Sequence, residues 1–467
     1  MNTAFIKYFH YFNVSMKKVM TTNSIDELCI RWSEYKAHLK SEPLLNQLKS
    51  FRDHLLCDEV FRKEVAEDAM SVIKKSFPML GIKDISLFLP KEQRERLGSD
   101  VEPSNLAMML IDALQIDVVQ RKQLLAMEPV NDAWRCWRNK QIDRYQMEDK
   151  SLRGKQITHI PFAIELTEGC SGECRFCGLS AKSLKPNQES FERIHDIYRD
   201  LLFELHRQTG QLGMSGILYW ATDPFDHPHY EAFSRVFAEE FGIWPATTTA
   251  IGELDIKRLH DLSQSELSNR PWGLRCSLRY PGAYKKIFKS LSARQRACIS
   301  FIPQYRGGAS SYAIAGRAYR PEQSKEQVNN GGTIACMSGL LISLPRRTIE
   351  LLTPCLAEPN HKEGYRSLIK RKFKSESDIP EVIMEIMKWM PCPAITLETV
   401  LAVTIDECQY HLYQSLGLEE VLEFISKKPI TLKELLTIKS KSLSRERLLS
   451  YCLDLIQNGV LMPMETF

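Results

Sequence analysis

The spacing of apolar residues changes near residue 155, and the change predicts two kinds of structure. In 45–56, 60–77 and 106–114, apolar residues recur every three or four positions, as in helices with one buried face. Prolines separate these stretches, namely Pro43, Pro78, Pro90 and Pro103. We therefore expect residues 1–150 to form a helical accessory domain.

Residues 151–345 alternate short β-type runs with helical stretches. Strands are expected at 157–166, 216–222, 244–251, 272–280, 298–305 and within 332–344. Helices are expected at 191–206, 230–241 and 256–262, with Gly210 and Gly242 ending the first two. Repeated β–α alternation favours a parallel sheet with crossover helices, an α/β fold class.

The last third of the chain breaks this alternation. A hairpin is expected from 340–344 and 348–352, opening a C-terminal extension that covers 346–414. From 415 to 467, helices are expected at 416–425, 432–436 and 444–458, followed by a short strand at 460–462. These elements predict a small α+β region at residues 415–467.

Composition is that of an ordinary globular protein. The chain has 467 residues, of which 43% are hydrophobic and 26% charged, with a net charge of +4. Two to four domains are expected, nucleic acid is an unlikely partner, and no apolar run approaches the ~20 residues that span a bilayer. No signal peptide is expected. The 13 cysteines, an odd number, favour a reducing cytoplasm over a disulfide framework.

Three of these cysteines form a C-x3-C-x2-C run: Cys170, Cys174 and Cys177, just after the apolar stretch 160–166. Three thiolates on one short loop can hold a cubane iron–sulfur cluster and leave one iron without a protein ligand. Zinc usually needs a second pair of ligands, and none follows at the usual distance. The run therefore favours a cluster.

This run resembles the signature of the radical S-adenosylmethionine (SAM) superfamily, with Phe176 in the aromatic slot. The resemblance implies a [4Fe–4S] cluster on the three cysteines, whose fourth iron binds SAM. Reductive cleavage, with electrons from a flavodoxin- or ferredoxin-type donor, then gives a 5′-deoxyadenosyl radical that abstracts hydrogen from the substrate. It also implies a partial (β/α)6 barrel with the site at the carboxyl ends of its strands.

The resemblance nominates SAM contacts as well. Thr222 and Asp223 stand where many members carry a Gly-Gly-Glu-Pro sequence, so Asp223 would take the carboxylate's role with a shorter side chain. Ser277 and Arg279 on the fourth expected strand are candidates to meet the SAM carboxylate. The alternative is that both are ordinary polar residues of a barrel interior.

As a whole, the layout resembles the proteusin-type peptide epimerases, which convert L- to D-residues in ribosomally made precursor peptides. The resemblance implies removal of a Cα hydrogen and its return by a thiol on the opposite face, with Cys336 favoured as donor and Cys355 second. Alternatively, these cysteines ligate an auxiliary cluster in a thioether- or carbon-cross-linking maturase, with Cys392 and Cys408, or they are buried structural thiols. A non-catalytic iron–sulfur or peptide-binding scaffold is a further alternative.

The 415–467 region resembles half of a winged helix. Such modules recognise the leader of a precursor peptide in several pathways, so this region is a possible leader-peptide-binding region. They also bind DNA, and the basic run Lys439–Arg447 leaves that open, although a solvated helix face accounts better for those charges.

Overall fold

The structure is a computed structural model that describes residues 24–89, 93–94, 101–148, 160–186, 189–309, 315–320, 337–354, 357, 362–390, 398, 400–403, 429–437, 444–457 and 461–464. The chain divides into two compact units, each built from segments distant in sequence. The first comprises Met1–Gln123, Asp223–Phe225 and Ile243–Tyr312, and the second Leu124–Thr222, Asp226–Gly242 and Ala313–Phe467. These limits differ from the expected boundaries at 150 and 345.

Helices dominate the N-terminal part of the first unit, as expected. They are α3 (Ile25–Ser41), α4 (Pro43–Cys57), α5 (Glu59–Ser76), α6 (Ile82–Ile85) and most of α8 (Asn105–Ala126). Ser24 begins α3 with a reciprocal capping box to Glu27, and the Asp58 carboxylate begins α5 by accepting the Val60 N–H at 2.9 Å. Local capping chemistry therefore sets where these helices start.

The first unit also contains a parallel sheet of three strands in chain order. The strands are β2 (Thr247–Thr249), β3 (Leu274–Leu278) and β4 (Ser300–Pro303). The connections contain α12 (Ile256–Gln264), α13 (Pro281–Ser290) and α14 (Ala293–Arg296). Side chains at 274, 276 and 278 share one buried cluster, so the expected β–α alternation is confirmed here.

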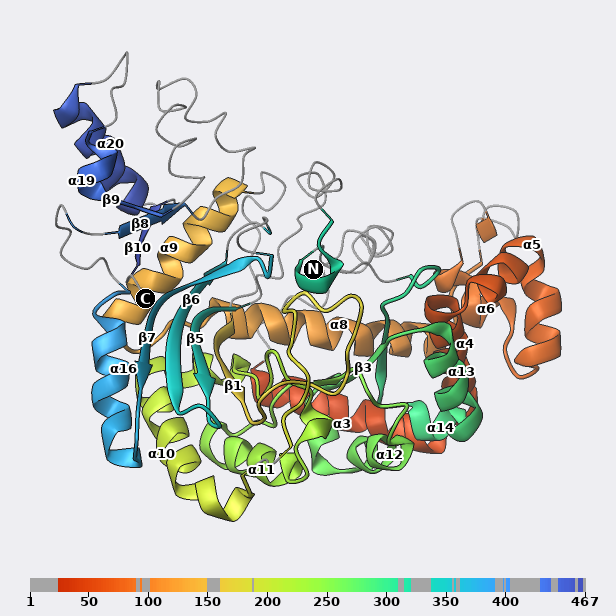
Figure 1. Cartoon of the computed structure of the whole chain (residues 1–467). Helices are drawn as coiled ribbons and strands as arrows, with labels where there is room; N and C mark the ends of the chain where they lie inside the picture. The colour runs from red at the N-terminus through yellow and green to blue at the C-terminus, as the bar shows by residue number, and fades with distance from the viewer. Residues whose placement is uncertain are drawn as a thin grey trace. The chain divides into compact units, whose positions relative to one another are not determined.

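A second sheet organises the second unit, with strand order β1-β5-β6-β7 (Figure 1). The strands are β1 (Ile160–Glu165), β5 (Met337–Ser343), β6 (Thr348–Pro354) and β7 (Tyr365–Lys372). β1 and β5 are parallel, whereas β5–β6 and β6–β7 are antiparallel. Because Ser343 pairs with Thr348, β5 and β6 form the hairpin that the sequence predicts.

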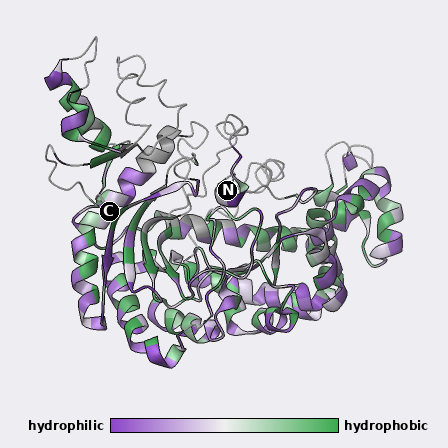
Figure 2. Cartoon of the chain, viewed as in Figure 1, coloured by the Kyte–Doolittle hydropathy of each residue, from purple (hydrophilic) through white to green (hydrophobic). Residues whose placement is uncertain are grey.

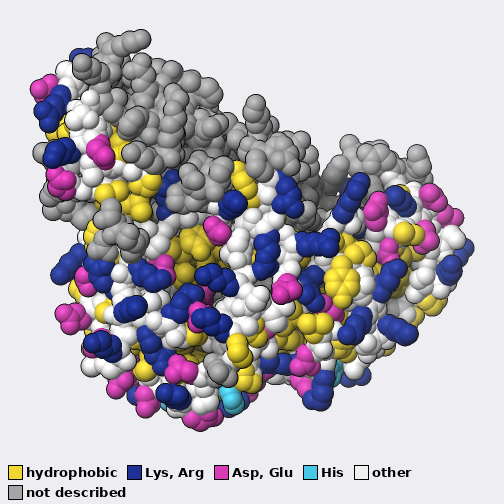
Figure 3. Space-filling view, in the orientation of Figure 1, with side chains coloured by type: hydrophobic (Ala, Val, Ile, Leu, Met, Phe, Trp, Pro, Cys, Tyr) yellow, Lys and Arg dark blue, Asp and Glu magenta, His cyan; other side chains and the backbone are white. Residues whose placement is uncertain are grey.

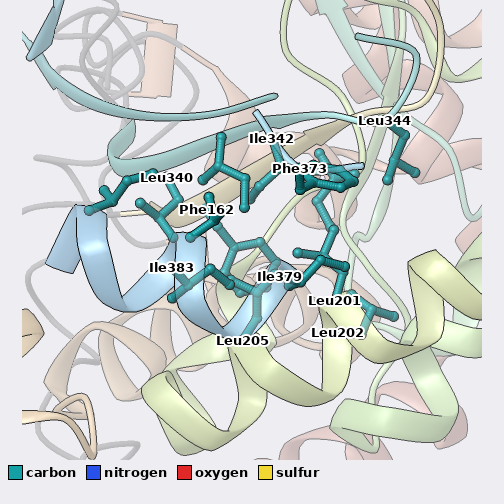
Figure 4. Packing of buried hydrophobic residues seen from close by; sticks show 14 of the residues in the cluster. Phe162, Leu201, Leu202, Leu205, Leu340, Ile342, Leu344, Phe373, Ile379 and Ile383 are labelled. Carbon is teal, nitrogen blue, oxygen red and sulfur yellow. The ribbon is translucent and has the colours of Figure 1, made fainter. Parts of the chain in front are cut away.

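One face of this sheet carries the main core of the second unit. It packs against α9 (Asp132–Glu148), α10 (Phe191–Thr209), α11 (Tyr230–Phe241) and α16 (Ile379–Met387). Phe162, Leu340 and Ile342 meet Leu205 and Ile383 there (Figure 4). The hydropathy of α10 alternates along its ribbon in Figure 2, as expected for an amphipathic helix.

The helices of the second unit show two buried tryptophans and the two helix ends that the sequence predicts. Trp134 and Trp137 of α9 are fully buried in the same cluster as Phe162, so the end of the N-terminal helical stretch packs against the sheet. Gly210 and Gly242 end α10 and α11 with φ angles of +57° and +71°.

The second expected strand, 216–222, is wrong except at one residue. Only Ile217 pairs, in a parallel bridge with Ala163. Gly216 lies so close to β1 that an added Cβ would be 2.2 Å from the Phe162 ring, and beyond Ile217 the chain bends at 218 and at 220–222 instead of extending. The described parallel strands thus form two sheets, one in each unit, and the partial (β/α)6 barrel remains a prediction.

The end of the chain combines short strands and helices. β8 (Val400–Val403), β9 (Ile430–Thr431) and β10 (Leu461–Met464) form an antiparallel sheet in the order β10-β8-β9. α19 (Leu432–Leu435) and α20 (Arg445–Gln457) match the predicted helices, whereas 416–425 lies outside the described residues. Because β8 precedes residue 415, this sheet begins before the predicted boundary.

Short 3-10 turns complete the description: η2 (Ser86–Phe88), η4 (Gly210–Ser215), η5 (Pro224–Asp226), η6 (Glu266–Asn269), η7 (Gly316–Ala318) and η9 (Glu376–Asp378). Over the described part of the chain, no helix has both the length and the apolarity needed to cross a bilayer. On the face in Figure 3, Lys and Arg side chains are interspersed with Asp and Glu.

Candidate functional site

The three-cysteine run forms a loop whose two ends are tied together. It leaves the carboxyl end of β1, and the Cys170 N–H donates to the Lys182 carbonyl at 2.8 Å. Gly169 makes this closure possible, because its φ is +86° and an added Cβ would lie 2.2 Å from the Ser183 carbonyl oxygen. A side chain at 169 would therefore force the loop open.

Backbone N–H groups inside the loop donate to two of its sulfurs. The Gly172 N–H lies 3.3 Å from Cys170 Sγ, and the Ala181 N–H lies 3.5 Å from Cys177 Sγ. Cys174 is buried, while Cys170 and Cys177 are half-buried. Hydrogen bonds of this kind stabilise thiolates and are one means by which proteins set the potential of an iron–sulfur cluster.

Arg317, on η7, holds the loop from a distant part of the sequence. Its guanidinium donates to the carbonyl oxygens of Cys174, at 3.3 Å, and of Ala181, and its backbone N–H donates to the Cys177 carbonyl at 2.9 Å. Gly316 lets the two segments approach, because an added Cβ would lie 2.5 Å from the Cys177 carbonyl oxygen. The loop is thus held in shape by a guanidinium that contacts its backbone carbonyls.

One further contact braces the loop, and the histidine that follows it in sequence is bonded elsewhere. The Asp226 carboxylate accepts the Ser171 N–H at 2.9 Å. His227 accepts the His229 N–H on Nδ1 at 3.1 Å, so its Nε2–H donates to the Glu189 carbonyl at 3.1 Å. Both ring nitrogens of His227 are therefore used within the protein, which argues against a zinc site built on this histidine.

A buried ion pair lies at the end of β1. Glu165 is 2% exposed, and its carboxylate contacts the Arg346 guanidinium at 2.5 Å and accepts the Ala221 N–H at 3.3 Å. Burial raises the pKa of Glu165, and Arg346 opposes this effect. Through Ala221, this pair positions the chain next to Thr222, which is half-buried.

The other predicted SAM contacts belong to the first unit and have partners there. Asp223 is buried, and its carboxylate accepts the Thr249 hydroxyl at 2.8 Å, the Phe225 N–H at 3.0 Å and the Ala250 N–H at 2.6 Å. This carboxylate therefore joins its loop to the end of β2. Its contact with the amino group of SAM remains a prediction.

Arg279 is paired with Glu253, which is fully buried, and their Nε–Oε1 distance is 3.0 Å. Ser277 is buried on β3, in register with Ile302. Ser277 lies within β3 and Arg279 directly after it, both inside the expected strand 272–280, but the guanidinium already has an anionic partner. Arg279 therefore neutralises the buried Glu253 carboxylate, and its contact with SAM remains a prediction.

The two candidate hydrogen donors, Cys336 and Cys355, lie outside the described residues. Their chain neighbours Met337 and Pro354 begin β5 and end β6, and Met337 pairs with Ile160 at the start of β1. The cysteine loop follows the other end of β1, about 20 Å along the strand at ~3.3 Å per residue. Both candidates are thus next in sequence to the end of the sheet far from the loop.

The donor set of the loop fits an iron–sulfur cluster by its chemistry. Cys170, Cys174 and Cys177 are soft thiol ligands on one tied loop, with N–H donors to two sulfurs and a guanidinium beside it. Among the described residues, no three His, Cys, Asp or Glu side chains are gathered as a metal ion would hold them. Phe176 is half-buried in the same loop.

Sequence reasoning missed Glu165, Arg346 and Arg317 as parts of this region. Glu165 carried a signal, since a carboxylate at the end of an otherwise apolar strand is unusual. Arg317 had none, because it lies 143 residues after Cys174, the residue whose carbonyl it contacts.

Comparison with known proteins gives one informative match. The chain is 27% identical over 413 residues to an uncharacterized protein, y4wI, of Sinorhizobium fredii, covering 81% of this chain and 78% of that protein. No protein-family description matches the chain. No solved structure matches it either.

Proposed function

We propose that this chain is a radical SAM enzyme that epimerises L-residues of a ribosomally made precursor peptide to D-residues. The observation that carries the proposal is the tied loop at the carboxyl end of β1, which presents three thiols and donates backbone N–H groups to two of them. That is where a parallel β/α architecture places its reactive groups.

In this proposal, Cys170, Cys174 and Cys177 hold a [4Fe–4S] cluster. The bound cluster, with SAM on its open iron, would supply the radical chemistry that removes a Cα hydrogen from the peptide. Arg317 would keep the loop in one geometry and offset the negative charge of the thiolates. Glu165 and Arg346 would hold the chain beside Thr222 in place.

The chain itself must also return a hydrogen atom. A thiol S–H is the side-chain bond best suited to give a hydrogen atom to a carbon radical, and Cys336 remains the proposed donor, with Cys355 second. The Cα that loses its hydrogen beside the cluster is the same atom that receives one, so the donor thiol must come into contact with that Cα. The described neighbours Met337 and Pro354 lie at the end of the sheet far from the loop, so their position does not support the donor assignment.

This position also favours a second candidate function. Cys336 directly precedes β5 and Cys355 directly follows β6, so both are next in sequence to the open end of one hairpin. Two thiols so placed suit shared ligation of an auxiliary cluster. The chain would then be a peptide cross-linking maturase.

Mass spectrometry of the product in D2O separates these functions. The anaerobically reconstituted protein is incubated with SAM, a reductant and the precursor peptide encoded nearest to it. Epimerisation predicts a gain of about one mass unit per modified residue and formation of 5′-deoxyadenosine. A loss of two units would identify a cross-linking enzyme, and absence of SAM cleavage by a protein with a full cluster would refute both functions.

Cysteine variants identify the donor. Cys336→Ala or Cys355→Ala should abolish deuterium incorporation while SAM cleavage continues, because abstraction does not need the donor. Cys452→Ala is the matched control, since that thiol is buried and belongs to α20 in the terminal region. Equal incorporation in all three variants would exclude both proposed donors.

A further inference from the structure

A row of polar side chains crosses the second sheet on its helix-covered face. Thr353 of β6 pairs directly with Arg366 of β7. Gly339 pairs with Leu352 in the antiparallel β5–β6 ladder, so Ser338 lies beside Thr353 on the other side. At about 4.8 Å between neighbouring strands, the row spans roughly 10 Å. The rest of this face is the apolar core that packs against α9 and α16.

Helix α9 packs over this row and contacts it through the Gln141 side-chain amide. The Thr353 hydroxyl donates to Gln141 Oε1 at 3.2 Å, and the Trp137 indole N–H donates to the Ser338 carbonyl at 3.2 Å. These two contacts place α9 directly over Ser338 and Thr353. Arg138 lies one turn before Gln141 and therefore on the same side of α9; its charge interacts with Glu128.

Three side chains of the row and of the helix over it have hydrogen-bond donors without acceptors. Arg366 is 5% exposed, Gln141 and Ser338 are each 1% exposed, and Arg366 Nε, Gln141 Nε2 and Ser338 Oγ have no hydrogen-bond partner among the described residues. No ion pair of Arg366 with a described residue exists either. A buried guanidinium without an anion is costly, so a protein that keeps one has a use for it.

We propose that Arg366, Gln141 and Ser338 form a buried binding site for a carboxylate. All three offer hydrogen-bond donors, and the planar guanidinium fork matches the two oxygens of a carboxylate. The uncompensated charge of Arg366 balances a monoanion, which favours a carboxylate over the dianion of phosphate. The site lies near the start of β1, about 20 Å from the cysteine loop, and does not depend on the proposed radical chemistry.

Thermal unfolding of the full chain tests the site with sodium acetate as the probe and sodium chloride as the ionic control. Acetate should raise the melting temperature of the wild-type protein by about 2–4 °C or more at saturation. Arg366→Met should raise the melting temperature without acetate, because it removes an unpaired buried charge, and should abolish the acetate effect. Arg366→Lys should keep the fold and weaken acetate binding at least tenfold.

Arg371→Gln is the matched control on the same strand, since Arg371 pairs with Glu385 and should leave the acetate effect unchanged. N-acetyl-Ala-Ala and its C-terminal amide distinguish the source of the carboxylate. A free terminus that binds more tightly than acetate points to a peptide end, and equal binding points to a small carboxylate. The site is refuted if Arg366→Met destabilises the protein, if acetate acts no more than chloride, or if inorganic phosphate stabilises more than acetate.

Discussion

Replacing Arg317 by methionine should loosen the cysteine loop without unfolding the protein. The guanidinium donates to the carbonyl oxygens of Cys174 and Ala181, and both bonds are lost in the variant. A hydrogen bond from a charged group contributes about 1.5–3 kcal/mol, and we use the lower end because Arg317 is half-buried. Loss of the two bonds then costs about 3 kcal/mol, or roughly 150-fold in the opening equilibrium of the loop.

Amide hydrogen exchange with peptide-level mass spectrometry measures this opening. The N–H groups of Cys170 and Cys177 bond to carbonyl oxygens within the loop region, so they report on its closure. In Arg317→Met, their exchange should accelerate by the factor above, while exchange in α10 and α11 stays unchanged. Iron retained after anaerobic reconstitution should fall in parallel.

Arg320→Met is the control for loss of a nearby guanidinium. Arg320 is exposed, and within the part of the chain that the structure describes it donates to the carbonyl oxygens of Arg317 and Tyr319, both outside the cysteine loop. Exchange in the loop should therefore match the wild type. Equal loop exchange in Arg317→Met and wild type would refute the bracing role that we derive for Arg317.

Three further predictions follow from other contacts. Gly242→Ala should lower the free energy of unfolding by only about 1–2 kcal/mol, since φ is +71° but no atom lies within 4 Å of the new Cβ. Gly169→Ala should lower it more and reduce bound iron, because its Cβ would be 2.2 Å from a backbone oxygen. Equal melting temperatures of the two variants would contradict this difference. Burial raises the pKa of Glu165, so the stability that its protonated form contributes is fully present below the ordinary carboxyl pKa of about 4.3 and is lost as pH rises through the higher folded value. Glu165→Gln should therefore gain stability relative to wild type as pH increases above ~4, as urea unfolding at several pH values would show, and a constant difference would contradict it. Arg279→Met should cost about 3–5 kcal/mol because Glu253 is left buried and unpaired, and adding Glu253→Leu should restore most of it; a double variant as unstable as the single one would show that the pair is not the cause.

Several elements of this fold follow directly from local sequence. The spacing of apolar residues and the glycines at 210 and 242 fix α10 and α11, because helix periodicity and C-cap geometry are properties of neighbouring residues. The hairpin of β5 and β6 was predictable for the same reason, since its strands are joined by a short turn. The position of three cysteines immediately after a buried strand was equally evident.

Other elements needed the tertiary structure. The stretch 216–222 has the composition of a strand, but only Ile217 pairs, because the chain then bends at 218 and at 220–222. The division into two units places 243–312 with the N-terminal helices, because side chains such as Trp272 share a core with them. Packing between distant segments decides such features.

The candidate site divides in the same way. The three thiols, their spacing and their place after β1 can be read from residue type and chain order. The folded chain was needed to show that Arg317 braces the loop, that Glu165 is paired with Arg346, and that Arg366 is buried without an anionic partner among the described residues. These contacts depend on which residues meet across long stretches of chain, and the periodicity of apolar residues does not indicate such partners.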